Sequence, residues 1–175
     1  MAKSSRAQIE KDEKKVLNQL QNNAKESIDK IAKKCGFSRQ KTWRIIKNLE
    51  KDDSIWGYTA VVDEEKMGKK GYILLFKGTN YPMEQKSEKI ILERELHKTA
   101  NKMDVIVRDS HWVHGMFDGA IYFFADDIKR AKEFQQQFQN LHSGNVCDMV
   151  LLETIVPIER GGFTNPTIKK TKKLT

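Results

Sequence analysis

The sequence contains only two cysteines and three prolines among its 175 residues. Two cysteines, Cys35 and Cys147, cannot form a disulfide framework, and they lack the close ligand spacing of a structural zinc site. No segment approaches the roughly 18 consecutive apolar residues that a membrane-spanning helix needs. The N-terminal residues also lack the apolar core of a secretory signal peptide. We therefore predict a cytoplasmic protein without a metal site and without a membrane partner.

The sequence also lacks the usual signatures of catalysis. It has no glycine-rich phosphate loop and no arrangement of a nucleophile with a base. His111 and His114 are three residues apart near the end of a predicted strand. On a regular strand that spacing places the two rings on opposite faces, so joint metal binding would need a bend. A role in a turn or an interface is the simpler interpretation, and we predict no catalytic residues and no cofactor.

Positive charge is abundant but unevenly distributed. The chain carries a formal net charge of +8, of which residues 1–56 contribute +6 and residues 161–175 contribute +4. The middle of the chain, residues 57–160, has a net charge of −2. This distribution indicates a polyanion-binding N-terminal part joined to a nearly neutral body. The four lysines of the last segment either add phosphate contacts or belong to a solvated tail.

The pattern over residues 27–49 predicts a helix-turn-helix. Apolar residues recur at helical spacing after Ser27, a favourable N-cap. Gly36 is placed to end the first helix, because glycine tolerates a left-handed φ. Ser38 is a second N-cap, and the helix after it has an apolar stripe that we predict to include Trp43. A preceding helix from Asp12 to about Asn23 would complete a three-helix core.

The second helix of this motif is basic and polar on its other side. In a helix-turn-helix such a helix enters the major groove of DNA. A helical hairpin with a merely solvated charged face is the alternative interpretation. The predicted contacts to base edges or phosphates are Ser38, Arg39, Gln40, Lys41, Arg44 and Lys47.

The second half of the chain has a different periodicity. Residues 55–63 favour an extended wing or a single strand, and residues 63–71 are polar and predict a hinge. Beyond the hinge, strand and helix patterns alternate in the order strand, helix, strand, strand, helix, strand. These elements are predicted at 72–78, 83–100, 104–113, 117–125, 127–141 and 146–158. The order predicts an α+β protein whose C-terminal part is a ferredoxin-like βαββαβ sandwich with both helices on one face of the sheet.

We thus predict four segments along the chain. They are a (winged) helix-turn-helix DNA-binding domain at 1–62, a hinge at 63–71, a ferredoxin-like domain at 72–160 and a basic tail at 161–175.

Two stretches of the first half are distinctive, IAKKCGFS (31–38) and IWGYTAVVDEEKMG (55–68). Through them the chain resembles the Lrp/AsnC, or feast/famine, family of bacterial and archaeal transcription regulators, over about residues 12–158. In the second half the resemblance depends on VHGMFDG (113–119), which looks like the family's turn between the central strands. His114 stands where the family often has a small hydroxyl residue, and Gly119 is an extra glycine.

The resemblance implies a sequence-specific, DNA-binding transcription regulator. It implies a homodimer that can assemble further into a tetramer or an octamer, and an amino-acid effector bound beside Gly115 and Asp118. The alternatives are a siroheme-decarboxylase-like enzyme of the same architecture and an effector-sensing module with a vestigial DNA-binding domain. The basic face argues against the enzyme, and the His-Asn-Tyr turn of those enzymes has no counterpart here.

Overall fold

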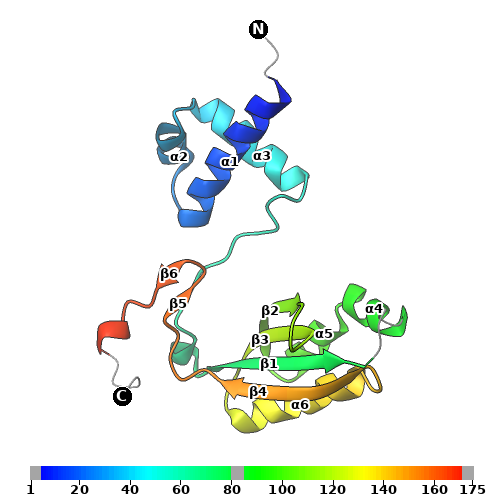
Figure 1. Cartoon of the computed structure of the whole chain (residues 1–175). Helices are drawn as coiled ribbons and strands as arrows, with labels where there is room; N and C mark the ends of the chain where they lie inside the picture. The colour runs from blue at the N-terminus through cyan, green and yellow to red at the C-terminus, as the bar shows by residue number, and fades with distance from the viewer. Residues whose placement is uncertain (1–4, 80–84, 171–175) are drawn as a thin grey trace. The chain divides into compact units, whose positions relative to one another are not determined.

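The computed structural model describes residues 5–79 and 85–170, which form two compact units, 1–61 and 62–175 (Figure 1). The first unit consists of three helices: α1 (Arg6–Asn22), α2 (Ile28–Cys35) and α3 (Arg39–Lys51). The second unit contains a four-stranded sheet with its helices, followed by a short hairpin.

The turn between α2 and α3 forms as the sequence predicts. The Ser27 and Ser38 side chains accept hydrogen bonds from the Lys30 and Lys41 backbone N–H groups, so each serine caps a helix N-terminus. Gly36 has a φ of 72°, the left-handed conformation that ends α2 without a steric cost. The predicted helix-turn-helix is confirmed.

A small apolar core holds the three helices together. Val16 of α1, Ile31 of α2 and Leu49 of α3 are almost completely buried in it. Cys35 is also buried there, and its thiol donates to the Lys15 backbone carbonyl. Phe37 and Ile55 pack against its margin.

The second unit is a ferredoxin-like sandwich with strand order β2-β3-β1-β4. All neighbouring strands are antiparallel. The elements are β1 (Lys70–Gly78), α4 (Gln85–Leu92), α5 (Glu95–Lys102), β2 (Ile106–Trp112), β3 (Gly119–Ala125), α6 (Ile128–Leu141) and β4 (Val146–Glu153). The predicted α+β class and βαββαβ order are confirmed, with the first helix divided into α4 and α5.

Alternate residues of the central strands make the main core. Tyr72 and Leu74 of β1 and Ile121 and Phe123 of β3 are completely or almost completely buried against α5 and α6. Phe123 contacts Phe134 of α6, with ring centroids 4.7 Å apart. The helices therefore cover one face of the sheet, as predicted.

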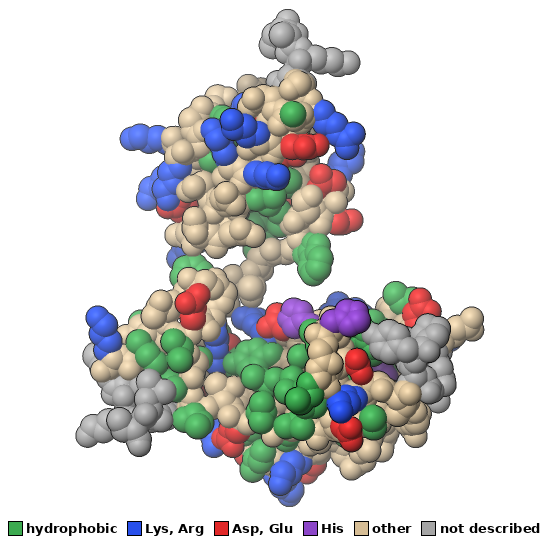
Figure 2. All heavy atoms as spheres, in the orientation of Figure 1, with side chains coloured by type: hydrophobic (Ala, Val, Ile, Leu, Met, Phe, Trp, Pro, Cys, Tyr) green, Lys and Arg blue, Asp and Glu red, His purple; other side chains and the backbone are tan. Residues whose placement is uncertain are grey.

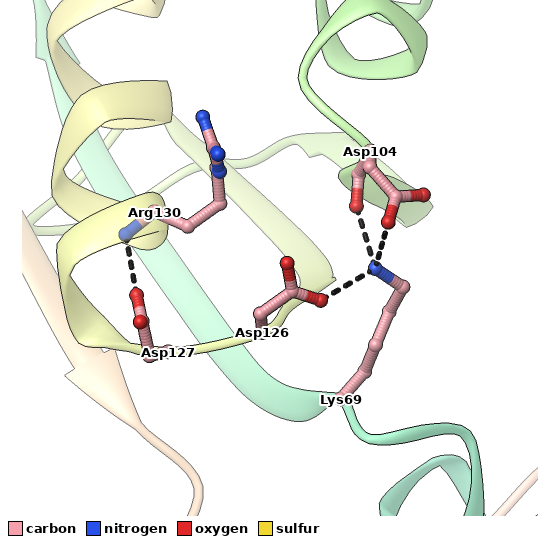
Figure 3. A network of polar contacts seen from close by, with 5 residues as sticks. All are labelled: Lys69, Asp104, Asp126, Asp127 and Arg130. Atoms are coloured by element: carbon pink, nitrogen blue, oxygen red, sulfur yellow. Dashed lines mark hydrogen bonds and ion pairs between the residues drawn. The ribbon is translucent and has the colours of Figure 1, made fainter.

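A lysine fastens one end of this sandwich (Figure 3). Lys69, just before β1, is buried and its Nζ donates to Asp104 Oδ2 and Asp126 Oδ1, both at 2.9 Å. The Asp104 backbone carbonyl accepts a third bond at 2.7 Å. Burial opposes the ammonium charge, but the hydrogen bonds to Asp126 and Asp104 outweigh it and raise the lysine pKa. Lys69 thus joins the loops before β2 and after β3.

Residues 63–71, which the sequence predicts to be a hinge, are largely structured. These residues form the 3₁₀ helix η1 (Glu64–Met67) and the first two residues of β1. Asp63 caps η1, and buried Glu64 forms an ion pair with Arg160. The division between units falls at Val61 and Val62 instead. Residues 56–63 belong to no strand, so neither predicted form of the wing is present in the described chain.

Three further element boundaries differ from the prediction. α1 begins at Arg6, not at Asp12, because Ser5 accepts a hydrogen bond from the Gln8 N–H and caps it. β4 ends at Glu153. The predicted tail is partly folded, because β5 (Glu159–Arg160) pairs with β6 (Phe163–Thr164), and η2 (Ile168–Lys170) follows. Lys172 and Lys173 lie outside the described residues.

Candidate nucleic-acid interface

Helix α3 presents a polar stripe to solvent on the first unit. Its buried side consists of Thr42, Ile45, Ile46 and Leu49. The exposed side carries Gln40, Trp43, Arg44 and Lys47, which follow the spacing of one helical face. Figure 2 shows Lys and Arg side chains distributed over the visible surface of this unit. A convex basic helix of this kind has the form that fits a DNA groove.

Trp43 corrects the sequence prediction, which placed it in the core. Its side chain is 51% exposed, whereas Thr42 beside it is completely buried. The Thr42 hydroxyl donates to the Ser38 backbone carbonyl at 3.1 Å, so its polar group is satisfied without water. The buried stripe therefore includes a threonine, and the tryptophan lies in the middle of the exposed stripe.

Lys41 is turned away from the exposed stripe. Its Nζ lies 2.6 Å from Asp12 Oδ2 and 4.1 Å from the centroid of the Phe37 ring. The hydrogen bond from Lys41 is the main cause that holds the Asp12 pKa below its ordinary value, although burial acts in the opposite direction. Lys41 therefore joins α3 to α1, and this contact occupies the ammonium that the sequence assigned to DNA.

Two other predicted cations have acidic neighbours. Lys47 Nζ lies 2.7 Å from Glu50 Oε2, and Glu50 also accepts a hydrogen bond from the Tyr58 hydroxyl. Arg39 Nε lies 3.6 Å from Asp29 Oδ1, with both side chains well exposed. Such exposed pairs are weak and exchange easily for phosphate contacts.

Arg44 and Gln40 have no hydrogen-bond or ion-pair partner among the described residues. Ser38 already caps α3 through its hydroxyl oxygen, and only its O–H hydrogen remains for a phosphate. Of the six predicted DNA contacts, Arg39, Gln40, Arg44 and Lys47 are exposed on α3, while Lys41 and Ser38 serve the fold of the unit.

The predicted effector turn lies in the second unit between β2 and β3. Asp118 Oδ2 accepts a hydrogen bond from the Gly78 N–H at 2.9 Å, and the Asp118 N–H donates to the Phe76 carbonyl. Asp118 therefore attaches the turn to the end of β1. Gly115 has a φ of 154° and open space where a side chain would begin.

No group of three or more His, Cys, Asp or Glu side chains within the described ranges is arranged to bind a metal. Helices long and apolar enough to cross a bilayer are likewise absent from the part of the chain that the structure describes.

Residues 13–55 match the family model of winged helix-turn-helix DNA-binding domains. The match contains α2, the turn and α3 entirely, together with most of α1. Comparison by sequence with curated proteins gives no significant match.

Several solved structures similar to most of this chain are named as regulators. An AsnC family transcriptional regulator from Agrobacterium tumefaciens has a TM-score of 0.60 at 18% identity, covering 91% of this chain and 98% of its own. A transcriptional regulator from Neisseria meningitidis, solved with L-methionine, has a TM-score of 0.64 at 17% identity. The match covers 92% of this chain and 98% of that regulator. The leucine response regulatory protein of Mycobacterium tuberculosis has a TM-score of 0.65 at 11% identity, with 86% and 94% covered. The resemblance inferred from sequence is thus confirmed at the level of the fold.

Proposed function

We propose that this chain, which has the fold of Lrp/AsnC-type regulators and a helix-turn-helix that matches the model of winged helix-turn-helix DNA-binding domains, is a sequence-specific transcription regulator. The proposal implies a cytoplasmic protein, because a regulator of this kind acts where the DNA is. It assigns no catalytic residue and no cofactor to the chain.

The exposed stripe of α3 carries the proposal. Arg44 is free of internal partners in the described chain, Arg39 pairs with exposed Asp29, and Lys47 pairs with partly buried Glu50. The net charge of +6 over residues 1–56 supplies a sequence-independent attraction to phosphates. Arg44 and Gln40 have the functional groups that read guanine and adenine in the major groove. Affinity would therefore come mainly from phosphates and specificity from one or two side chains.

A homodimer is proposed from the uncovered face of the sheet. On the side away from the helices, Ile73 of β1 lies between Tyr122 of β3 and Leu152 of β4. In the next row, Leu75 lies between Ala120 and Val150. Hydrophobic side chains gather in Figure 2 over the region where Figure 1 draws β1 and β4.

Val150 and Leu152, two positions apart on the same face of β4, are 39% and 45% exposed. Contiguous exposed apolar surface of this kind marks interaction sites. A second copy of the same face would cover these residues with a self-complementary surface. Two copies of α3 would then read two half-sites, and assembly into a tetramer or an octamer would extend the array.

An amino-acid-like effector beside Gly115 and Asp118 is part of the proposal. The Neisseria meningitidis relative was solved with L-methionine, and Asp118 uses only one carboxylate oxygen in its bond to Gly78. The other oxygen is available for an ammonium group.

Selection of bound fragments from source genomic DNA, followed by footprinting, tests the regulator function. The expected result is a protected site with two half-sites, and log affinity that falls linearly with log salt concentration. A chain that protects no fragment at physiological salt would instead be a sensing module with a vestigial DNA-binding domain. The same selection with a panel of amino acids tests the effector.

A further inference from the structure

The second unit contains a cavity of about 260 Å³ that the proposed DNA-binding function does not use. It lies between α4 and α5 on one side and the ends of β1, β2 and α6 on the other. Its floor is aromatic: the Phe76 ring lies 4.9 Å from Phe138 and 6.0 Å from Trp112, centroid to centroid. Ile90 and Leu96 add aliphatic walls. The volume is just below the common range for ligand pockets, about 300–1,000 Å³, and therefore suits a small molecule.

A buried hydroxyl group in the wall lacks a partner. Ser87 of α4 is only 3% exposed, and its Oγ has no hydrogen-bond partner among the described residues. Leaving a buried hydroxyl without a hydrogen-bond partner is energetically costly, so such groups are rare without a ligand or an ordered water. The orphan hydroxyl is an independent indication that the cavity receives a polar group.

The other polar groups in the wall favour an anion. Arg94 lies at the junction of α4 and α5, and His97 and His142 contribute imidazoles. Burial lowers the pKa of both histidines, and Arg94 lowers that of His97 further. Neutral imidazole still offers one N–H donor, and Arg94 supplies a permanent positive charge.

Acidic side chains are absent from the described residues that line the cavity. An amino acid bound there would have no carboxylate opposite its ammonium group, and burying that group unpaired would be costly. Asp118 bonds to Gly78 behind the wall and is not one of the lining residues. The side chains of the wall therefore favour a ligand that has a carboxylate and no amino group over an amino acid.

We propose that this cavity binds a small monocarboxylate that has a branched aliphatic or aromatic body and no amino group. The carboxylate pairs with Arg94 and accepts hydrogen bonds from Ser87 and an imidazole. The apolar body lies on Phe76 and Phe138. The proposal depends on the second unit alone, so its failure leaves the proposed DNA-binding function untouched.

Calorimetric titration of the full chain, without DNA, tests the proposal with three probes of similar shape. They are 4-methylpentanoate, its neutral amide and leucine, which differs from the first by its amino group. We expect 4-methylpentanoate to bind at least about tenfold more tightly than the other two, the value of one charge-assisted hydrogen bond. Equal or tighter binding of leucine that Arg94→Asn also weakens would overturn the proposal in favour of an amino-acid site in this cavity, distinct from the one proposed beside Gly115 and Asp118. Absence of binding by 4-methylpentanoate would also overturn it.

Variants then locate the binding site. Arg94 has a φ of 55°, so Arg94→Asn keeps a residue that tolerates this conformation while it removes the charge. We expect it to weaken binding about tenfold, and Arg94→Lys to retain part of the affinity. Ser87→Ala is a second, independent test, with a smaller expected loss. Lys98→Gln is the matched control, because Lys98 pairs with Glu95 on the surface of α5. If folded Arg94→Asn and Ser87→Ala both bind as the unmodified chain does, the carboxylate binds elsewhere and the assignment fails.

Discussion

The ammonium group of Lys41 lies 2.6 Å from the carboxylate of Asp12, although 29 positions separate the two residues. Asp12 is 5% exposed, so its charge needs a partner, and Gln8 supplies a second hydrogen bond at 2.8 Å. Helix α3 is thus fixed to α1 by a polar contact at the edge of the apolar core. Lys41, which the sequence predicted to contact DNA, orients the helix for which we propose that role.

Asp12→Asn should destabilise the first unit by about 1–3 kcal/mol, because Lys41 loses its charged partner in a partly buried place. The hydrogen bond from Lys41 depresses the folded-state pKa of Asp12. The stabilisation is therefore complete above the unfolded pKa, about 4, and is lost as pH falls through the folded value. Urea unfolding followed by circular dichroism should show the two proteins converging below about pH 4.

The matched control for this prediction is Asp29→Asn. Asp29 pairs with Arg39, also on α3, but at 3.6 Å and with both side chains exposed. Its loss should change stability by no more than about 0.5 kcal/mol. If the two substitutions change the free energy of unfolding equally, burial of Asp12 does not strengthen its contact with Lys41.

Trp43→Ala should weaken binding to the selected DNA site by about 1–3 kcal/mol and leave the slope of log affinity against log salt unchanged. The indole is exposed beside Arg44 and has no charge, so it can contact a thymine methyl group or a base edge but releases no counterion. Arg44→Gln should weaken binding to the selected site by about 1–3 kcal/mol and relax the preference for guanine at the contacted position.

Fluorescence anisotropy over a series of salt concentrations measures both quantities. Lys14→Gln, an exposed lysine of α1, is the charge-matched control. A Trp43→Ala protein with normal DNA affinity but altered oligomeric state would assign the indole to a protein interface instead.

The order of elements could be predicted from sequence because the signals were local. Ser27, Gly36 and Ser38 encode caps and a left-handed turn, and the structure uses each in that way. The alternating burial along β1 and β3 and the apolar stripe of α6 are also one-dimensional patterns. These patterns are sufficient for the fold class and for the strand order of a known topology.

The errors arose where a polar residue took an unexpected partner. Thr42 is buried because its hydroxyl bonds to Ser38, and this moved the apolar stripe by one position and exposed Trp43.

The break between α4 and α5 was also not predicted. It falls at Arg94, and no glycine or proline in the sequence marks it. Leu92 before the break is 75% exposed, while Ala100 after it is in the core. In the single helix predicted over 83–100, both residues would lie towards the same side.

The candidate sites depended even more on three-dimensional contacts. Lys41 and Arg44 are indistinguishable in sequence as basic residues of one helix, and only the position of Asp12 on α1 separates their roles. The cavity beside Arg94 was not predicted at all, because its wall combines residues of helices and strands that are distant in sequence. A buried serine without a partner leaves no signal in the sequence.

Leu75→Glu should convert the proposed dimer to a monomer at micromolar concentration. Leu75 lies in the middle of the uncovered sheet face, where it would be buried against a second copy, and an unpaired carboxylate there would be costly. Sedimentation velocity measures the change. Gln137→Glu introduces the same charge on the exposed side of α6 and should leave the dimer intact. If both substitutions dissociate the dimer, the cause is a general effect of charge. If neither does, this face of the sheet is not the dimer interface.

Gly119→Ala should destabilise the second unit by about 1–3 kcal/mol, the usual cost of overpacking. A Cβ built at Gly119 would lie 2.0 Å from Cζ of Phe76, whose ring is confined by Trp112 and Phe138. Because Gly119 has no side chain, the Phe76 ring can occupy the space in which a Cβ would lie. Thermal unfolding should show a lower midpoint for this variant, and Phe76→Leu in the same chain should restore part of the loss, since a smaller side chain relieves the contact.

Gly57→Ala is the control for this prediction, because nothing lies within 4 Å of a Cβ built at Gly57. If Gly119→Ala unfolds at the same temperature as Gly57→Ala, the ring can move aside without cost and the close contact does not constrain the sheet.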